Sequence, residues 1–460
     1  MKKKYFTNIF LLAMLILFAT SPLQAQSWTN SQSLMMNTDV VVDLQAQKVQ
    51  EYGDKYLITI SKKTDSSNYC FSSWINGSNV VHNSFLNTSD ITINDFTILG
   101  DSLYFCGNRK VSQNLTLGIL GRFNINDFLD DGNFGYNFAY LADTENLTKL
   151  VAYYTQGDTV CLMAIGHDTI SDTTIGRITL LKFETSSTSP DYEIIKCPFV
   201  SYTQKEVMHD ISLLDNEIIT LSHIHPTNMY VLRYFKRQSS FDNTYNVYYT
   251  FPNLQFNVSS DVYEFPLHFT NISDLKNAVC VSIIKNQEYF TMVNILKNCS
   301  DYVFSTQLVL HKEKLNKALE MDYSVDNKEI LLLNNTYSGQ QMYQPMVHLD
   351  PESVTNYYAI EEIFDKPNQL NHFFIIPNGK YAVAGVRPLS QTSGEQLLSV
   401  KDINPLENDC VSMFDKEIDV IHVPDGNWNN ISLLYLQYGG AWNSGGAFDS
   451  SEPINVYCAD

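Results

Sequence analysis

Several short catalytic motifs are missing from this 460-residue sequence. There is no GxSxG, no GxxxxGK, no HExxH and no CxxC. Their absence excludes the commonest forms of serine hydrolase, phosphate-loop protein and zinc site. Charged residues are scarce at 17%, and acidic residues outnumber basic ones by 50 to 30. Because a net charge of −20 repels phosphate groups, we expect no nucleic-acid partner.

Apolar runs long enough to span a bilayer are also missing, so no membrane span is expected. Lys2, Lys3 and Lys4 precede an apolar run from Ile9 to Ala19. This pattern predicts a signal peptide over residues 1–25. No cysteine precedes Cys70, which excludes an N-terminal lipid anchor of the bacterial lipoprotein kind. We therefore expect an exported protein in the periplasm, on the cell surface or outside the cell.

Aromatic residues make up 13% of the chain, and Asn, Ser and Thr are abundant. This composition predicts many short strands and turns rather than helices. Only "HKEKLNKALEM", at 311–321, indicates a helical turn or two, with a solvated loop as the alternative.

A β-hairpin pattern recurs along the chain. Its clearest copy is "NDFTILGDSLYFCG", in which apolar residues flank a Gly100-Asp101 turn. Similar hairpins centre on Gly53-Asp54, Gly157-Asp158, Asp215-Asn216, Lys276-Asn277, Asn327-Lys328 and Asn378-Gly379, with a mean spacing of about 54 residues. Each is followed by a third apolar segment, such as "GRITLLKFE", and often by a fourth, such as "DYEIIKCPFV". Three to four strands in each repeat unit is the number expected for one blade of a β-propeller.

Over roughly residues 40–405 the chain resembles seven-bladed β-propellers as a fold class. The predicted fold is all-β: a seven-bladed propeller of mostly four-stranded antiparallel blades in residues 26–409. Residues 410–460 would form a short β/loop tail packed on it. Six or eight blades, or unrelated hairpins in a sandwich or two all-β domains, are the alternatives. The segment "DVVVDLQ", at 39–45, is the expected closing strand. In its signal sequence, Asn- and Tyr-rich repeats and Cys-bearing tail, the chain also resembles uncharacterised exported proteins of Bacteroidetes-type bacteria.

Histidines cluster in the fourth repeat, "VMHDISLLDNEIITLSHIHP". His223 and His225 alternate along one strand and share a face. A two-residue turn would pair His209 with residue 222 and place it on the other face. A three-residue loop would pair it with His223. His209, Asp210, His223 and His225 are therefore candidate ligand-binding residues at one end of the hairpin, and we expect no metal there.

Asp95, Asp210 and Asp322 occupy one column of the aligned repeats. They form either a ring of acids at a channel mouth or local caps that bond their own backbone.

Five of the eight cysteines fall into two groups. Cys106, Cys161 and Cys280 lie at apolar positions of second strands and are expected in the core. Cys410 and Cys458 bracket a tail with many turn-forming residues. A disulfide between them would stabilise the fold by about 4 kcal/mol in the chain-entropy model, and we predict that bond.

The function expected from these features is binding by a secreted or cell-surface propeller. A glycan, a peptide or an envelope protein is the expected partner. The alternatives are a propeller enzyme acting on a polysaccharide or peptide at the channel mouth, and a structural envelope component. No catalytic residue and no cofactor is assigned, so the sequence leans away from an enzyme.

Overall fold

The computed structural model describes residues 32–41 and, with gaps between strands, residues 48–459. The longer segments outside this description are 1–31, 42–47, 63–68, 185–190, 197–204, 239–244, 251–261, 352–356, 363–368 and 404–410. The described part is almost entirely β, as the sequence predicts, and its strands form several small antiparallel sheets. We name each sheet after the strand that comes first in it.

The sheets follow one another along the chain. The β2 sheet consists of β2 (Lys48–Tyr52), β3 (Tyr56–Lys62), β4 (Tyr69–Ile75) and β5 (Val80–Leu86). The β6 sheet consists of β6 (Ile91–Leu99), β7 (Ser102–Ser112), β8 (Leu115–Asn124) and β9 (Gly135–Leu141). The β10 sheet consists of β10 (Asn146–Tyr154), β11 (Thr159–Ile170), β12 (Thr173–Glu184) and β13 (Asp191–Lys196). The β14 sheet consists of β14 (Lys205–Leu214), β15 (Glu217–His225), β16 (Met229–Lys236) and β17 (Tyr245–Thr250).

Three further sheets complete the order. The β18 sheet consists of β18 (Val262–Ser273), β19 (Lys276–Lys285), β20 (Glu288–Cys299) and β21 (Tyr302–Leu310). The β22 sheet consists of β22 (Leu315–Ser324), β23 (Glu329–Ser338), β24 (Gln341–Tyr343), β25 (Met346–Leu349) and β26 (Tyr357–Glu362). The β27 sheet consists of β27 (Gln369–Ile376), β28 (Lys380–Pro388), β29 (Ser393–Asp402) and, from the other end of the chain, β1 (Gln32–Val41).

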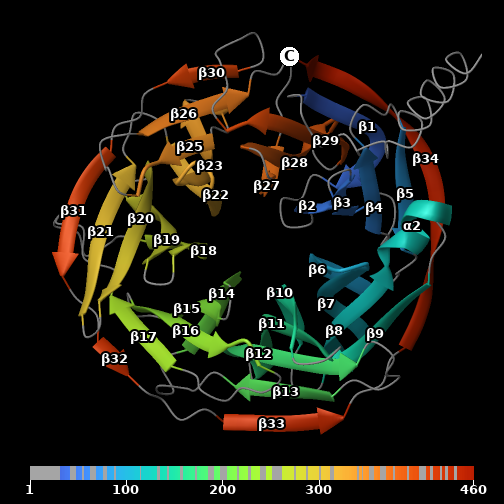
Figure 1. The fold of residues 1–460 in the computed structure, drawn as a ribbon, viewed down its shortest axis with the longest axis horizontal. Coiled ribbons are helices and arrows are strands. Elements are labelled where there is room, and N and C mark those ends of the chain that lie inside the picture. Colours follow the sequence, from blue (N-terminus) through green and yellow to red (C-terminus); the bar gives the residue numbers. More distant parts are fainter. Residues whose placement is uncertain are drawn as a thin grey trace, which may run out of the picture.

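The sheets are arranged around a common centre, with the first strand of each sheet nearest to it (Figure 1). Each of these first strands contacts the first strand of the next sheet, and β27 contacts β2. The C-terminal strands lie at the outer rim: β30 (Val411–Phe414), β31 (Ile418–Pro424), β32 (Asn427–Asn429), β33 (Leu434–Gly439) and β34 (Asn443–Ala459). Because β34 pairs with β1, β5 and β9, it joins three of the sheets into one 13-stranded sheet.

Apolar side chains cover both faces of the sheets. In β7, Phe105 packs in a cluster with Ile58 and Phe71 of the β2 sheet. The next residue, Cys106, packs in a different cluster with Leu147 and other residues of the β10 sheet. The two faces of one strand are therefore buried against two different neighbours, because successive side chains point to opposite sides. Cys161 and Cys280 are buried in the same way, as the sequence predicts.

The β27 and β2 sheets meet although they lie at opposite ends of the chain. Trp74 and Leu57 pack with Ala384 and Leu398 in one apolar cluster. Beside this cluster the buried amide of Gln396 donates to Thr59 Oγ1 at 2.8 Å and to Ser61 Oγ at 2.7 Å, and it accepts from Ser72. A buried amide with all these partners stabilises one specific fit between the two sheets.

The strand that completes the β27 sheet is β1, which pairs antiparallel with β29. The sequence pointed to 39–45 for this role. The paired residues are instead 32–41, so only Asp39, Val40 and Val41 are shared, and the rest of the expected segment lies outside the described residues.

β-Bulges explain a glycine on the second strand of three of the hairpins. One extra residue lies between Ile93 and Asp95 in β6, and the residue opposite Ile93 is Gly107. A Cβ at Gly107 would lie 1.8 Å from the backbone oxygen of Thr92. Gly166 faces the bulge of β10 in the same way, and Gly385 faces that of β27. Glycine is required where the bulged backbone approaches this closely.

Three details differ from the sequence-based predictions. The expected helical segment at 311–321 is wrong: residues from Leu315 onward form β22, whose Ala318 and Met321 pack into the core. Tertiary burial overrides the helix propensity of this Lys- and Leu-rich stretch. The hairpin placed at Lys276-Asn277 turns two residues earlier, since Ser273 pairs with Lys276. A short helix, α2 (Ile125–Asp131), was not predicted.

Replacing Gly107 with alanine tests the bulge. We expect Gly107→Ala to lower the free energy of unfolding by about 2–3 kcal/mol, because the new methyl group collides with backbone rather than with a movable side chain. Gly53→Ala is the control: Gly53 has a φ of +55° but nothing within 4 Å of its Cβ position, so it should cost only about 1 kcal/mol. Urea denaturation of both variants measures the difference. Equal costs would show that the close approach to Thr92 is unimportant.

Candidate functional site

The same bulges place ionisable residues around the centre of the molecule. The residue that resumes pairing directly after each bulge is Asp95 in β6, Lys149 in β10, Asp210 in β14, Glu320 in β22 and His372 in β27. In β18 pairing resumes at His268. Acidic and basic residues therefore alternate from sheet to sheet. We call these residues the axial ring.

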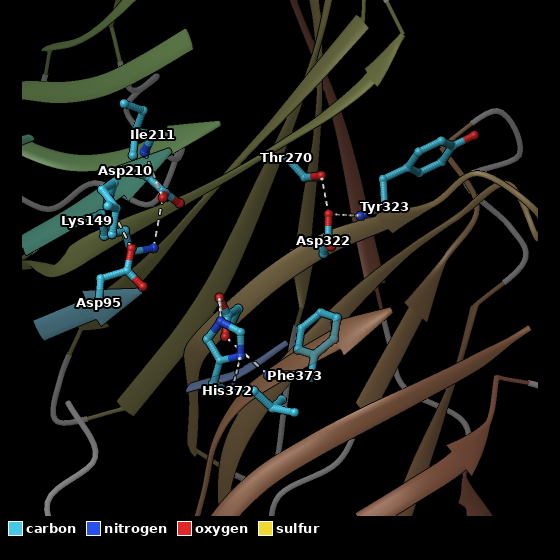
Figure 2. A network of polar contacts seen from close by, with 12 residues as sticks. Asp95, Lys149, Asp210, Ile211, Thr270, Asp322, Tyr323, His372 and Phe373 are labelled. Carbon is cyan, nitrogen blue, oxygen red and sulfur yellow. Dashed lines mark hydrogen bonds and ion pairs between the residues drawn. The ribbon is translucent and has the colours of Figure 1, made fainter. Parts of the chain in front are cut away.

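Two neighbouring pairs of acidic and basic residues in the axial ring bond to each other. Lys149 Nζ lies 2.8 Å from Asp210 Oδ1, and His372 Nε2 lies 3.2 Å from Glu320 Oε1. Figure 2 shows Lys149 between Asp95 and Asp210. Burial lowers the pKa of Lys149, but the carboxylates of Asp210, Glu320 and Asp95 raise it by more, so the pKa lies above its usual range. Lys149 is therefore charged at neutral pH.

The axial ring also connects sheets through their backbones. The N–H of Leu150 donates to Asp95 Oδ2 at 2.9 Å, and the N–H of Phe373 donates to Glu320 Oε2 at 3.3 Å. Val49 N–H donates to His372 Nδ1 at 3.4 Å. In each case the donor belongs to the first strand of the next sheet. The residues of the axial ring therefore have a structural role, because these hydrogen bonds join the first strands of neighbouring sheets.

Asp322 does not occupy the position that the aligned repeats gave it. The turn after β22 is longer than the two-residue turns after β6 and β14, because Ser324 pairs with Glu329. Glu320 is consequently the counterpart of Asp95 and Asp210. Asp322 accepts hydrogen bonds from Thr270 Oγ1 at 3.0 Å and from the Tyr323 N–H at 2.7 Å (Figure 2). Asp95 and Asp210 do lie around the centre. Asp210 and Asp322 also accept hydrogen bonds from the backbone of the next residue, Ile211 and Tyr323, which is the local capping that the sequence offered as the alternative.

Burial raises the pKa of Asp322 above its usual range, the Tyr323 and Thr270 hydrogen bonds oppose this rise, and the Asp210 charge adds to it. The raised pKa means that the folded protein keeps this proton to a higher pH than the unfolded chain does.

The structure brings two of the four candidate binding residues together. The turn is the shorter one, because Leu214 pairs with Glu217, yet His209 still reaches His223. It does so because His209 is the extra residue of the β14 bulge, which neither expected register contained. Its Nε2 bonds to His223 Nδ1, and the stacked rings have centroids 4.8 Å apart. Asp210 points away to Lys149. The His225 side chain lies outside the described residues, as do Cys410 and the side chain of Cys458.

Sequence reasoning missed a buried ion pair beside these histidines. Arg233 Nη2 lies 2.6 Å from Glu206 Oε2, and Ser222 donates to the same carboxylate. Both charged side chains are almost fully buried. A single arginine inside the apolar run "MYVLRYF" was the available signal, because a charge in such a strand requires a buried partner.

A pocket of about 430 Å³ lies where the β2, β6 and β10 sheets meet. Its lining is mostly polar and includes Lys62, Asp90, Asn108, Lys110, Glu145, Asn146 and His167. Asp90 precedes β6 and Glu145 precedes β10, so the pocket lies at the end of these hairpins opposite their turns. We call it the Asn146 pocket.

The Asn146 pocket is held in shape by side-chain amides. Asn94 and Asn108 both donate to Asn146 Oδ1, at 2.7 and 2.8 Å, and Asn94 also donates to the backbone oxygen of Leu147 at 2.6 Å. Asn146 is thereby fixed in one orientation. Burial lowers the pKa of His167, against the opposing effects of Glu145 and Asp168, so this imidazole is neutral at pH 7. The pocket thus offers fixed donors and acceptors.

Within the described part of the chain, no group of three or more His, Cys, Asp or Glu side chains is placed to hold a metal ion. The described residues also contain no helix with the length and apolarity needed to cross a bilayer. No disulfide joins two of them. No protein-family model matches the chain, and neither does any curated protein.

Asp322→Asn tests the environment of this carboxyl. An acid whose pKa is raised on folding stabilises the fold fully below its unfolded pKa of about 4, and this contribution is lost as pH rises toward the folded pKa. Asparagine accepts the same two hydrogen bonds and does not titrate. We therefore expect the stability of the variant relative to the natural protein to increase with pH from about 4 upward.

Chemical denaturation at a series of pH values measures this difference, and effects of other groups cancel in the comparison. Thr270→Val is the matched variant. Loss of its hydroxyl donor should raise the pKa of Asp322 further and extend the decline to higher pH. A stability difference between the Asp322→Asn variant and the natural protein that stays constant across pH would contradict the assignment.

Proposed function

We propose that this protein is an exported seven-bladed β-propeller that binds a polar ligand of the glycan class in the Asn146 pocket. The propeller is supported by the contacts between first strands, which return from β27 to β2. It is also supported by apolar clusters on both faces of the sheets and by completion of the β27 sheet by β1. Export is supported by the sequence of residues 1–25.

The single observation that carries the binding proposal is the fixed amide cluster in a pocket of small-molecule size. Amide, hydroxyl and carboxylate groups that both donate and accept match the hydroxyl groups of a sugar. Lysines and carboxylates both line the pocket, so neither charge sign dominates it. A neutral hydroxyl-rich ligand fits this mixture better than a strongly charged one. A peptide or an envelope protein is the other occupant that the test below distinguishes.

The axial ring and the histidine pair support ligand binding less well. Lys149 and Asp210 bond to each other, and Asp95, Glu320 and His372 accept backbone N–H groups. His209 and His223 are both buried and bond to each other. Groups already used in this way would lose existing bonds on binding a ligand.

An enzyme acting on a polysaccharide is the second candidate. The observation that favours it is that Asp90, Glu145 and a neutral His167 line the same pocket. Two carboxylates beside one glycosidic bond are the usual requirement for glycoside hydrolysis. A third candidate, a purely structural envelope component, requires no ligand at all.

Binding of the full chain to an array of soluble glycans and peptides tests the proposal. We expect binding to a glycan. We also expect Lys110→Met and Glu145→Gln each to weaken it about tenfold, which corresponds to one charge-assisted hydrogen bond. Lys236→Met is the matched control, because Lys236 is an exposed strand lysine next to the turn of the β14 sheet and should leave binding unchanged.

The other outcomes each exclude part of the proposal. Binding of a glycan that is insensitive to both pocket variants would place the site elsewhere. Release of reducing ends, abolished in Glu145→Gln without loss of binding, would show the enzyme instead. Binding only to peptides, or to nothing in the array, would overturn the glycan proposal.

A further inference from the structure

The orientation of the Asn146 amide follows from a chain of hydrogen bonds that begins at a backbone carbonyl. Because a carbonyl oxygen can only accept, the Asn94 atom that lies 2.6 Å from the Leu147 oxygen must be the amide nitrogen. The same nitrogen lies 2.7 Å from Asn146, so the Asn146 atom that it meets must be the oxygen, Oδ1. The Asn108 atom 2.8 Å from that oxygen must then be a nitrogen. The backbone of Leu147 therefore determines all three amide orientations.

Two β-bulges make this chain of hydrogen bonds possible. Asn94 is the extra residue of the β6 bulge, because it lies between Ile93 and Asp95, where the pairing with β7 shifts. Leu147 directly precedes the bulge of β10. A bulge turns a side chain out of the regular alternation of a strand. Asn94 can thus reach the first strand of the next sheet, and the backbone of the fold fixes the orientation of the pocket amides.

Asn146 consequently presents a hydrogen-bond donor to the pocket. It is half-buried and lines the pocket, and its Oδ1 already accepts two N–H groups. Within the described part of the chain, nothing accepts from its Nδ2. Turning the amide over would set this nitrogen against the nitrogens of Asn94 and Asn108. A ligand that displaces water from the pocket must therefore offer an acceptor to Asn146 Nδ2, or leave its hydrogens unpaired.

The groups around this donor match an acetamido group. The carbonyl of an acetamido group accepts and carries no hydrogen, its N–H donates, and its methyl group is apolar. Asn146 Nδ2 is the donor for the carbonyl, and the carboxylate of Glu145, which also lines the pocket, is an acceptor for the N–H. Apolar carbon for the methyl group comes from three other lining residues, Ile91, Thr92 and Thr116. A plain hydroxyl group would pair with the donor but would leave the apolar part of this lining unused.

We propose that the Asn146 pocket is specific for the acetamido group of an N-acetylated amino sugar, whose carbonyl accepts a hydrogen bond from Asn146 Nδ2. The inference rests on the proposed function, because it names the class of sugar that binds at the same site. An N-acetylated amino sugar is uncharged, in agreement with the mixed charges of the lining. Asn146 is then the residue that determines specificity.

Replacing single asparagines with aspartate tests the amide orientations without any ligand. Asn146→Asp keeps an acceptor for both N–H groups, so the Tm should change by about 1 °C or less. Asn94→Asp instead replaces a donor with an acceptor that faces the Leu147 carbonyl and the Asn146 oxygen. Its Tm should fall by about 5 °C. Failure of Asn94→Asp to fold, while Asn146→Asp folds, is the extreme form of the same result.

The matched control for the added charge is Asn124→Asp. Asn124 is exposed and pairs with Ser102 beside the turn of the β6 sheet, at the end away from the pocket. Its Oδ1 accepts from the Asn126 N–H at 2.8 Å, and a carboxylate does the same. The Tm of this variant should not change. A loss of stability in Asn146→Asp as large as that in Asn94→Asp would overturn the assigned orientation and the inference with it.

Specificity is tested with an array of sugars in which one hydroxyl is replaced by an acetamido group or by a free amino group. We expect the N-acetylated form to bind at least about tenfold more tightly than the other two forms. Asn146→Asp should weaken this binding about thirtyfold, because an acceptor then faces the carbonyl. It should also reverse the preference toward the protonated amino sugar, which pairs with the new carboxylate. Asn124→Asp should bind as the natural protein does.

The outcomes distinguish this inference from the proposed function. Glycan binding without a preference for the N-acetylated form contradicts the acetamido inference and leaves the glycan-binding function intact. A preference that Asn146→Asp does not alter has the same meaning. Binding to no sugar of the array overturns both.

Discussion

The inner hairpins of this protein are apolar on both faces, and no sheet of four strands can bury two faces by itself. Each sheet therefore requires a neighbouring sheet on either side. Both faces of every sheet are buried only when the last sheet packs against the first. Trp74, Ala384 and Gln396 lie at that meeting. The apolar cluster supplies burial, while the Gln396 amide and its hydroxyl partners specify one alignment. Everything else in the fold depends on this closure, including the position of β1.

The bulges satisfy a second requirement at the centre. First strands converge there, and a regular strand would direct only alternate side chains toward its neighbours. One extra residue changes the direction of the chain and brings an ionisable residue into reach of the next sheet. Asp95 and Glu320 then accept backbone N–H groups, and Lys149 pairs with Asp210. A glycine such as Gly107 is the local cost of this arrangement.

Local pattern was sufficient to predict most strands, the hairpin turns at Gly100-Asp101 and Asn327-Lys328, and the burial of Cys106. Local pattern was not sufficient where the pairing of a strand depends on residues far away in the sequence. The contact between His209 and His223 follows from a bulge whose position is decided by the residue opposite. The sequences of outer strands such as β30, "VSMF", and β32, "NWN", give almost no signal for a strand, since the sheet edges with which they pair determine their structure. The Asn146 pocket combines three sheets, so no single repeat contains it.

The position of β1 has a consequence for how the protein is made. It is the first of the described strands to be synthesised, yet both of its partners come far later: β29 begins at Ser393, and the part of β34 that pairs with β1 begins at Ile454. During synthesis β1 stays without these partners until residues 393–402 and 454–459 have been made. A product truncated by premature termination would retain an unpaired β1 and an open outer edge, both of which proteases attack readily. The arrangement thus makes protection of the outer edge dependent on synthesis of the C-terminal strands.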